Sequence, residues 1–188
     1  MTRISGRVLA SIVVLVSVAA EGAVSAQDDE AVADGDLLAP ASVSGVITLG
    51  SPNQPSAETP GEPPVVQSTL DYGWTLTVEM DDPRVSGTYE TNRNEYVYAS
   101  GEKARTGRGH LVNEGGSWSV EFRGFHTRLP APGTGNYYVE FWTGEGGYEG
   151  LSAMMLSEPG EGTTWEATGI IVPGSWPEPP EWVLPPAE

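Results

Sequence analysis

The chain has 188 residues, of which 24 are glycine and 16 are proline, so turns and irregular segments are frequent. It contains no cysteine, which excludes structural disulfides, thiolate metal sites and cysteine nucleophiles. The formal net charge of −17 repels nucleic acids and anionic membrane surfaces, so we expect neither as a partner.

The N-terminus has the pattern of a secretory signal peptide over residues 1–26. Arg3 and Arg7 precede the apolar run Val8–Ala20, and small residues stand at the cleavage position around Ala26. An uncleaved anchor is the alternative, although a membrane span needs about 20 apolar residues. We therefore predict a secreted protein that has no contact with the membrane after cleavage.

Residues 27–41 are acidic and without periodicity, which predicts a disordered leader. The β-rich run Val43–Leu49 is a candidate first strand, and the proline-rich segment Gly50–Pro64 is predicted to be a solvated loop. Alternatively, everything before Val65 is tail. We favour pairing of Val43–Leu49 with the sheet, because its apolar residues have no other explanation in so polar a region.

The clearest strand signal is Thr69–Met80, in which every second residue is apolar. Six residues share that pattern: Leu70, Tyr72, Trp74, Leu76, Val78 and Met80. Alternation with a period of two places such residues on one face of a strand. The segment therefore predicts a strand with one buried and one wet face.

Further short strands follow, separated by turns rich in glycine, proline and asparagine. They are predicted at Val85–Glu90, Tyr96–Tyr98, Arg108–Asn113, Ser117–Phe125, Asn136–Thr143, Tyr148–Leu156 and Thr164–Val172. The polar interval Asn92–Asn94 and the segment Gly101–Gly107 are predicted outside the strands. Residues 174–188 are predicted to be an extended proline-rich tail.

The predicted fold is all-β, an antiparallel meander of about eight strands over residues 42–173. Short sequential connections favour pairing of neighbours, which gives either a closed or nearly closed barrel or a sandwich. A barrel is favoured because glycine recurs within the strands, where it allows bends and bulges. These glycines are Gly73, Gly87, Gly109, Gly124, Gly150 and Gly169.

Two segments resemble known families. Asp82–Thr88 and Gly144–Leu151 resemble a group of uncharacterised secreted bacterial proteins, and the second also resembles the glycine-rich turn of allene oxide cyclase and dirigent-like barrels. The resemblance implies an eight-stranded barrel with a central cavity for small hydrophobic molecules. It transfers no catalytic residue to this chain, and a fold does not by itself imply a function.

No catalytic or metal-binding motif is complete. Ser152 lacks the final glycine of a nucleophile elbow, and the two histidines, His110 and His126, are too few for a zinc site. An acidic group, Asp71, Glu79, Asp81 and Asp82, contains the ligand type of calcium but no calcium-binding loop. We therefore expect no catalytic residue, metal or cofactor.

The aromatic strand Asn136–Thr143 is the predicted ligand-binding element, with Tyr137, Tyr138, Phe141 and Trp142 as its residues. Tyr137 and Phe141 share one face, and Tyr138 and Trp142 share the other. If Tyr138 and Trp142 point outward, they form a platform for sugar rings or a protein. Alternatively, the tail covers the outward face with Trp176 and Trp182.

These observations leave three hypotheses open. The first is a non-catalytic secreted barrel that binds a small apolar molecule, a glycan or a protein. The second, based on the resemblance, is a cyclase-like enzyme that needs an ionisable residue inside the barrel, with Glu90, Glu121 and Glu140 as candidates. The third is a structural protein of the cell surface.

Overall fold

A computed structural model describes residues 39–127 and 135–176. These residues form nine β-strands and two three-residue 3₁₀ turns, η1 (Pro83–Val85) and η2 (Gly146–Tyr148). The strands are β1 (Ala41–Gln54), β2 (Ala57–Pro60), β3 (Val65–Met80), β4 (Gly87–Tyr98), β5 (Lys103–Asn113), β6 (Gly116–Thr127), β7 (Gly135–Glu145), β8 (Leu151–Pro159) and β9 (Thr164–Pro173). None of the helical segments in this part of the chain is long and apolar enough to cross a membrane.

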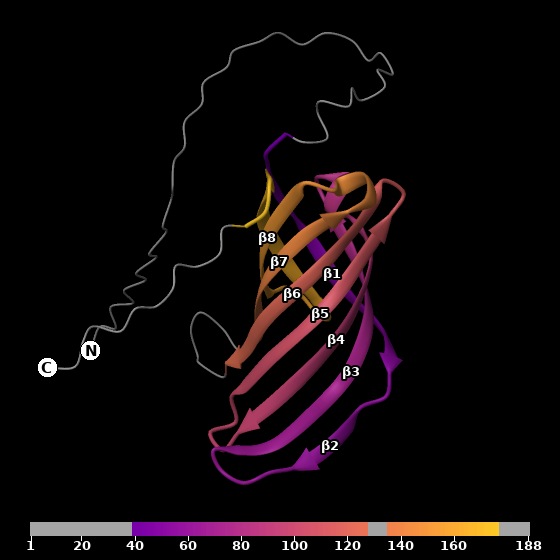
Figure 1. The fold of residues 1–188 in the computed structure, drawn as a ribbon. Helices are drawn as coiled ribbons and strands as arrows, with labels where there is room; N and C mark the ends of the chain where they lie inside the picture. The colour runs from indigo at the N-terminus through magenta and orange to yellow at the C-terminus, as the bar shows by residue number, and fades with distance from the viewer. Residues whose placement is uncertain (1–38, 128–134, 177–188) are drawn as a thin grey trace, which may run out of the picture. The chain divides into compact units, whose positions relative to one another are not determined.

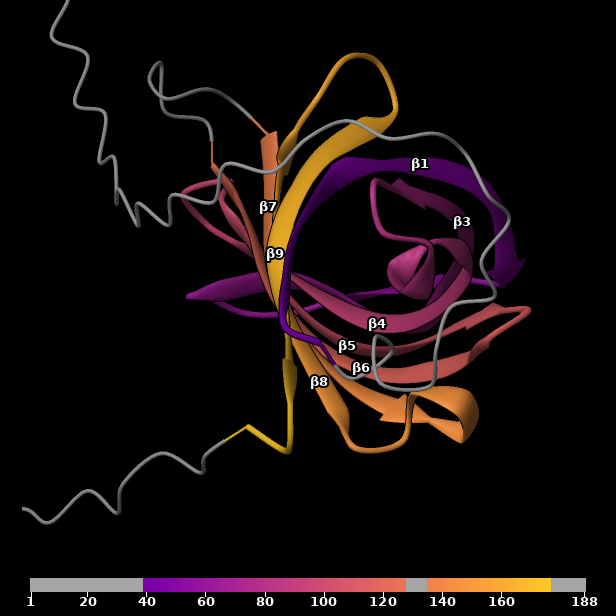
Figure 2. The same cartoon turned by 90° about the horizontal axis from the view of Figure 1, so that it is seen from above.

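Eight of the strands close into an antiparallel barrel, which confirms the predicted fold class. Neighbours in sequence pair from β3 to β9, and β1 pairs with both β9 and β3 (Figure 1). Seen from above, the strands form a ring (Figure 2). The ninth strand, β2, lies outside the barrel on the N-terminal part of β3.

The pairing of the first strand is confirmed, and the strand is longer than predicted. Val43 lies opposite Gly169 on β9, while Ile47 lies opposite Val78 on β3. β1 continues to Gln54, and β2 forms within the segment predicted to be a loop. All residues from Gly50 to Gly61 are exposed, so this part of the sheet is solvated as expected.

β3 contains a bulge that the alternating pattern does not reveal. Asp71 has a positive φ of 52°, and the register with β4 shifts between Thr69 and Tyr72. The extra residue reverses which face the preceding side chains occupy. Leu70 is therefore 47% exposed, although the pattern predicts it on the buried face, and Thr69 is buried in its place.

β4 and β5 are continuous through segments predicted to be loops. Asn92–Asn94 pairs with Thr106–Arg108 in an unbroken ladder. The side chains that point into the barrel here are polar, so this part of the sequence lacks the alternation of apolar and polar residues by which a strand is predicted. Polar residues inside a strand indicate a polar interior at this level of the barrel.

Aromatic rings fill one half of the barrel. Trp118 and Trp142 are both almost completely buried, with ring centres 6.0 Å apart in an edge-to-face arrangement. Tyr148 stacks on Trp118 at 5.4 Å, and Tyr89 lies 5.8 Å from Trp142. Such pairs contribute about 0.5–1.5 kcal/mol each beyond burial, so this half forms the core.

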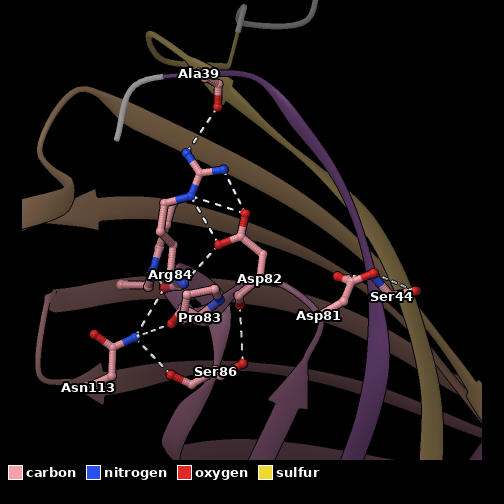
Figure 3. Close-up of polar contacts among 9 residues, drawn as sticks. Ala39, Ser44, Asp81, Asp82, Pro83, Arg84, Ser86 and Asn113 are labelled. Atoms are coloured by element: carbon pink, nitrogen blue, oxygen red, sulfur yellow. Dashed lines mark hydrogen bonds and ion pairs between the residues drawn. The ribbon is translucent and has the colours of Figure 1, made fainter. Parts of the chain in front are cut away.

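The turn η1 closes the same end of the barrel, and its short coil lies within the ring in Figure 2. Val85 is fully buried, and the Trp118 indole donates a 2.7 Å hydrogen bond to the Arg84 carbonyl. The Asp82 carboxylate pairs with the Arg84 guanidinium at 2.7 Å (Figure 3). The Asn113 amide donates to three carbonyls of the turn segment, those of Pro83, Arg84 and Ser86.

We predict that Asn113→Ala destabilises the protein by about 2–4 kcal/mol, because the carbonyls of Pro83, Arg84 and Ser86 lose their donor. The same substitution removes the acceptor of the Tyr148 hydroxyl, which lies 2.7 Å from Asn113 Oδ1. Urea unfolding measures the change. Glu114→Ala at the adjacent exposed position is the control and should change stability by less than about 0.5 kcal/mol. Equal stability of the two variants would contradict the role of Asn113 as the anchor of the turn.

Candidate functional site

The other half of the barrel holds a cavity that opens at its end. The cavity has a volume of about 540 Å³ and is lined by residues of β1, β2, β3, β4, β5, β7 and β9. Four aromatic rings line it, those of Tyr72, Trp74, Tyr138 and Trp165. Its polar lining consists of Gln54, Ser56, Glu58, Thr69, Arg93, Glu95, Arg105 and Asn136. We call it the mouth cavity.

Strand geometry explains why charged residues line this cavity. On β4, the inward positions are Tyr89, Thr91, Arg93 and Glu95, which alternate with residues on the outer face. The first is deep in the barrel and the last is near the mouth. The interior therefore changes along β4 from aromatic packing to charge.

Arg93 is held by aromatic rings, yet part of its guanidinium has no partner. The guanidinium carbon lies 5.0 Å from the ring centre of Tyr72 and 6.0 Å from that of Trp74. Its Nη1 donates to the Tyr138 hydroxyl at 3.4 Å. Among the described residues, Arg93 Nε is the buried side-chain nitrogen or oxygen that lacks a hydrogen bond. A buried donor without an acceptor costs about 1–3 kcal/mol, so Arg93 has capacity for an acceptor from outside the chain.

A second charged group, Glu95, is neutralised within the chain. The Lys103 ammonium lies 2.8 Å from Glu95 Oε1, and the Arg105 guanidinium pairs with Oε2. Burial acts to raise the pKa of Glu95, but the hydrogen bonds and charges of Lys103 and Arg105 outweigh it and lower the pKa. The carboxylate therefore adds little free negative charge to the mouth cavity.

Below the mouth cavity, Glu140 is buried in the middle of the barrel. Its Oε2 accepts hydrogen bonds from the Tyr89 hydroxyl at 3.2 Å and the Trp142 indole at 3.1 Å. Its Oε1 lies 3.5 Å from the Ser157 hydroxyl. Burial raises the pKa of Glu140 to about 7, although all three hydrogen bonds act to lower it. The carboxyl group thus changes charge near neutral pH.

An inward glycine makes room for the tyrosine that binds Glu140. A Cβ atom built on Gly109 would lie 2.2 Å from Tyr89 Cε2, too close for any larger residue without movement of the ring. Gly124 accommodates Tyr138 in the same way, at 2.4 Å. Two of the strand glycines noted in the sequence, Gly109 and Gly124, therefore leave space for the rings of neighbouring tyrosines.

The structure divides the predicted aromatic residues between the two faces of β7. Tyr138 is 8% exposed and lines the mouth cavity, and Trp142 is 1% exposed in the core. The prediction that Tyr138 and Trp142 form an outward platform is therefore wrong, because both rings point into the barrel. Tyr137 stacks on Phe125 at 5.2 Å, and Phe141 is 44% exposed on the outer face. Ligand binding by these four residues stays a prediction.

The start of the tail covers part of the outer face. The Trp176 ring lies edge-to-face on Phe141 at 6.3 Å, and its indole donates to the Ala153 carbonyl at 3.1 Å. This contact agrees with the alternative in which the tail covers the outward aromatics. Trp182, the signal peptide and most of the leader lie outside the described residues.

Several of the remaining candidate residues have structural partners. Ser152 is buried and donates to the Gly174 carbonyl at 2.7 Å, while Asp81 accepts from the backbone and hydroxyl of Ser44 (Figure 3). His110 lies 3.3 Å from Glu145, and His126 contacts Asn136. Within residues 39–127 and 135–176, no group of three histidine, aspartate or glutamate side chains could hold a metal ion.

Sequence reasoning identified Tyr138 and, as one of three acidic candidates, Glu140. It missed Arg93, Glu95 and Arg105, because it assigned their segments wholly or partly to loops. The alternation of faces along a strand would have located Arg93. It lies four residues after the inward Tyr89, and residues an even number apart on a strand share one face.

Comparisons of the chain with models of protein families, with curated proteins and with solved structures gave no significant match. The barrel fold agrees with the resemblance noted in the sequence, but membership of a family does not follow from it.

We predict that Glu140→Gln flattens the pH dependence of stability. The pKa of Glu140 is higher in the folded state than its usual 4.5, so its contribution is fully present below about pH 4.5 and is lost as the pH rises through about 7. The loss amounts to about 3 kcal/mol by proton linkage. The midpoint temperature of thermal unfolding should therefore fall more from pH 5 to pH 8 in the wild type than in the variant.

Glu121→Gln is the matched control for this experiment, since Glu121 lies on the outer face with a side chain 61% exposed. It should follow the wild type across the same pH range. Parallel curves for wild type and Glu140→Gln would mean that Glu140 does not titrate in this window.

Proposed function

We propose that the barrel binds a small, largely aromatic or apolar molecule that carries an anionic or hydrogen-bond-accepting group. Arg93 supports this proposal most directly, because it lines the mouth cavity and its buried Nε has no hydrogen-bond partner among the described residues. A carboxylate, sulfonate or carbonyl oxygen supplies the acceptor that the described residues do not. Hydrogen bonds between charged groups are about twice as strong as neutral ones.

The shape and lining of the mouth cavity fit such a ligand. Its volume of about 540 Å³ lies in the range of small-molecule sites. The rings of Tyr72, Trp74, Tyr138 and Trp165 offer flat apolar surface for the body of the ligand. Because Arg93 already stacks on two of these rings, its guanidinium is oriented before a ligand enters.

Electrostatics also favour an acceptor group at this end. The chain carries a net charge of −17, yet three of its nine basic residues, Arg93, Lys103 and Arg105, gather around the mouth cavity. Glu95 is balanced by two of them. Glu58 also lines the cavity, so the three basic residues outnumber the two carboxylates by one, which favours an anion on a molecule whose net charge otherwise repels it.

We predict that the full chain binds 1-anilinonaphthalene-8-sulfonate, an aromatic sulfonate, with a rise in its fluorescence. Arg93→Gln should weaken this binding about tenfold or more, because each 1.4 kcal/mol lost is a factor of ten in affinity. Arg108→Gln is the matched control, since the Arg108 side chain is 83% exposed on the outer wall. Equal affinities of the two variants would refute a role for Arg93, and no binding by the wild type would refute the proposal.

A cyclase-like enzyme is the second candidate, and one observation favours it. Of the three acidic residues named from the sequence, Glu140 lies inside the barrel, whereas Glu90 and Glu121 are exposed. The pKa of Glu140, raised to about 7 by burial, suits a group that exchanges protons at neutral pH. Its test is conversion of a bound small molecule that is lost in Glu140→Gln while binding remains.

A further inference from the structure

A small inner cavity lies directly beneath the mouth cavity. The two cavities share three lining residues, Arg93, Tyr138 and Trp165. The inner cavity adds the Glu140 carboxyl and the Ser157 hydroxyl. A ligand held at Arg93 therefore has one further compartment within reach, and the wall of that compartment includes a carboxyl group.

We propose that the ligand carries a second polar group, a hydroxyl or an amine, which enters the inner cavity and donates a hydrogen bond to Glu140. This inference rests on the proposed function and names its ligand class. The molecule is an aromatic acid with a donor at the end opposite its acid group.

The volume of the inner cavity sets the size of that second group. It is about 30 Å³, which exceeds the roughly 10–15 Å³ that one water needs and leaves no room for a ring. A single heavy atom with its hydrogens fits, as in a hydroxyl, an amine or a methyl group. Size alone does not separate these three, so the choice depends on hydrogen bonding.

Hydrogen bonding selects a donor over a methyl group. Glu140 receives hydrogen bonds from three side chains, and two of them, Tyr89 and Trp142, use Oε2. Oε1 has a long contact of 3.5 Å with the Ser157 hydroxyl and retains capacity to accept. A methyl group placed there would cover a buried carboxyl oxygen without giving it a hydrogen bond, which costs about 1–3 kcal/mol.

The neighbouring hydroxyl of Thr91 does not compete for this position. Its Oγ1 donates to the Trp74 carbonyl at 3.2 Å, so its hydrogen is already used within the chain. The Tyr89 hydroxyl is likewise committed to Glu140. Neither hydroxyl is therefore free to take the place of a ligand donor at Glu140.

The test compares matched probes on the full chain. Benzoate, phenylacetate and 3-phenylpropionate are each used with hydrogen, methyl or hydroxyl at the ring carbon opposite the acid chain. Their affinities are measured by displacement of 1-anilinonaphthalene-8-sulfonate. At one of the three chain lengths, the hydroxyl probe should bind about tenfold more tightly than its methyl counterpart.

At pH 8, where the Glu140 carboxyl is mostly ionised, Glu140→Gln should reduce that preference to about twofold or less, because the charged acceptor is lost. A preference that survives in this variant would overturn the assignment to Glu140. The wild-type comparison needs no variant and stands if Glu140→Gln fails to fold.

The outcomes separate this inference from the function on which it depends. If the hydroxyl probes bind no better than the methyl probes at any chain length, the inference fails and the mouth site stands. If neither the fluorescent sulfonate nor any of the nine acids binds, the proposed function fails and the inference fails with it.

Discussion

The pairing of β1 with both β9 and β3 is the constraint on which the rest of the structure depends. It joins the first and last strands of the meander and gives every barrel strand two neighbours. A closed sheet separates an inside from an outside, so the side chains of each strand divide between two environments. Without closure, neither the aromatic core nor the charged mouth would be shielded from water.

The enclosed space is used in two ways along the barrel axis. Around Trp118 and Trp142 it is filled by rings and sealed by η1. Around Arg93 it is left open and lined with charge. Glu140 lies between these regions. It accepts hydrogen bonds from the core residues Tyr89 and Trp142, and it forms part of the wall of the inner cavity. The packed half therefore holds in place the group that faces the open half.

The sequence predicted the barrel well where inward residues are apolar, as in Ser117–Phe125 and the second half of Thr69–Met80. It predicted poorly where the interior is polar, because Arg93 and Glu95 look like loop residues when their partners are unknown. The orientation of β7 could not be decided, since both faces carry aromatic rings. The inward face has rings with polar ends that find partners, as Trp142 does with Glu140. Phe141, which has no polar atom, lies outside beneath Trp176.

The outer strand β2 has a consequence for self-association. It extends the sheet beyond the closed ring, so its far side is an edge with backbone groups that could pair with another chain. That edge is four residues long, fully exposed, carries Glu58 and ends at Pro60, which has no N–H to donate. Short length, charge and proline are the features that prevent strands from adding to an edge. The barrel thus gains a rim beside its mouth without offering a template for growth of the sheet.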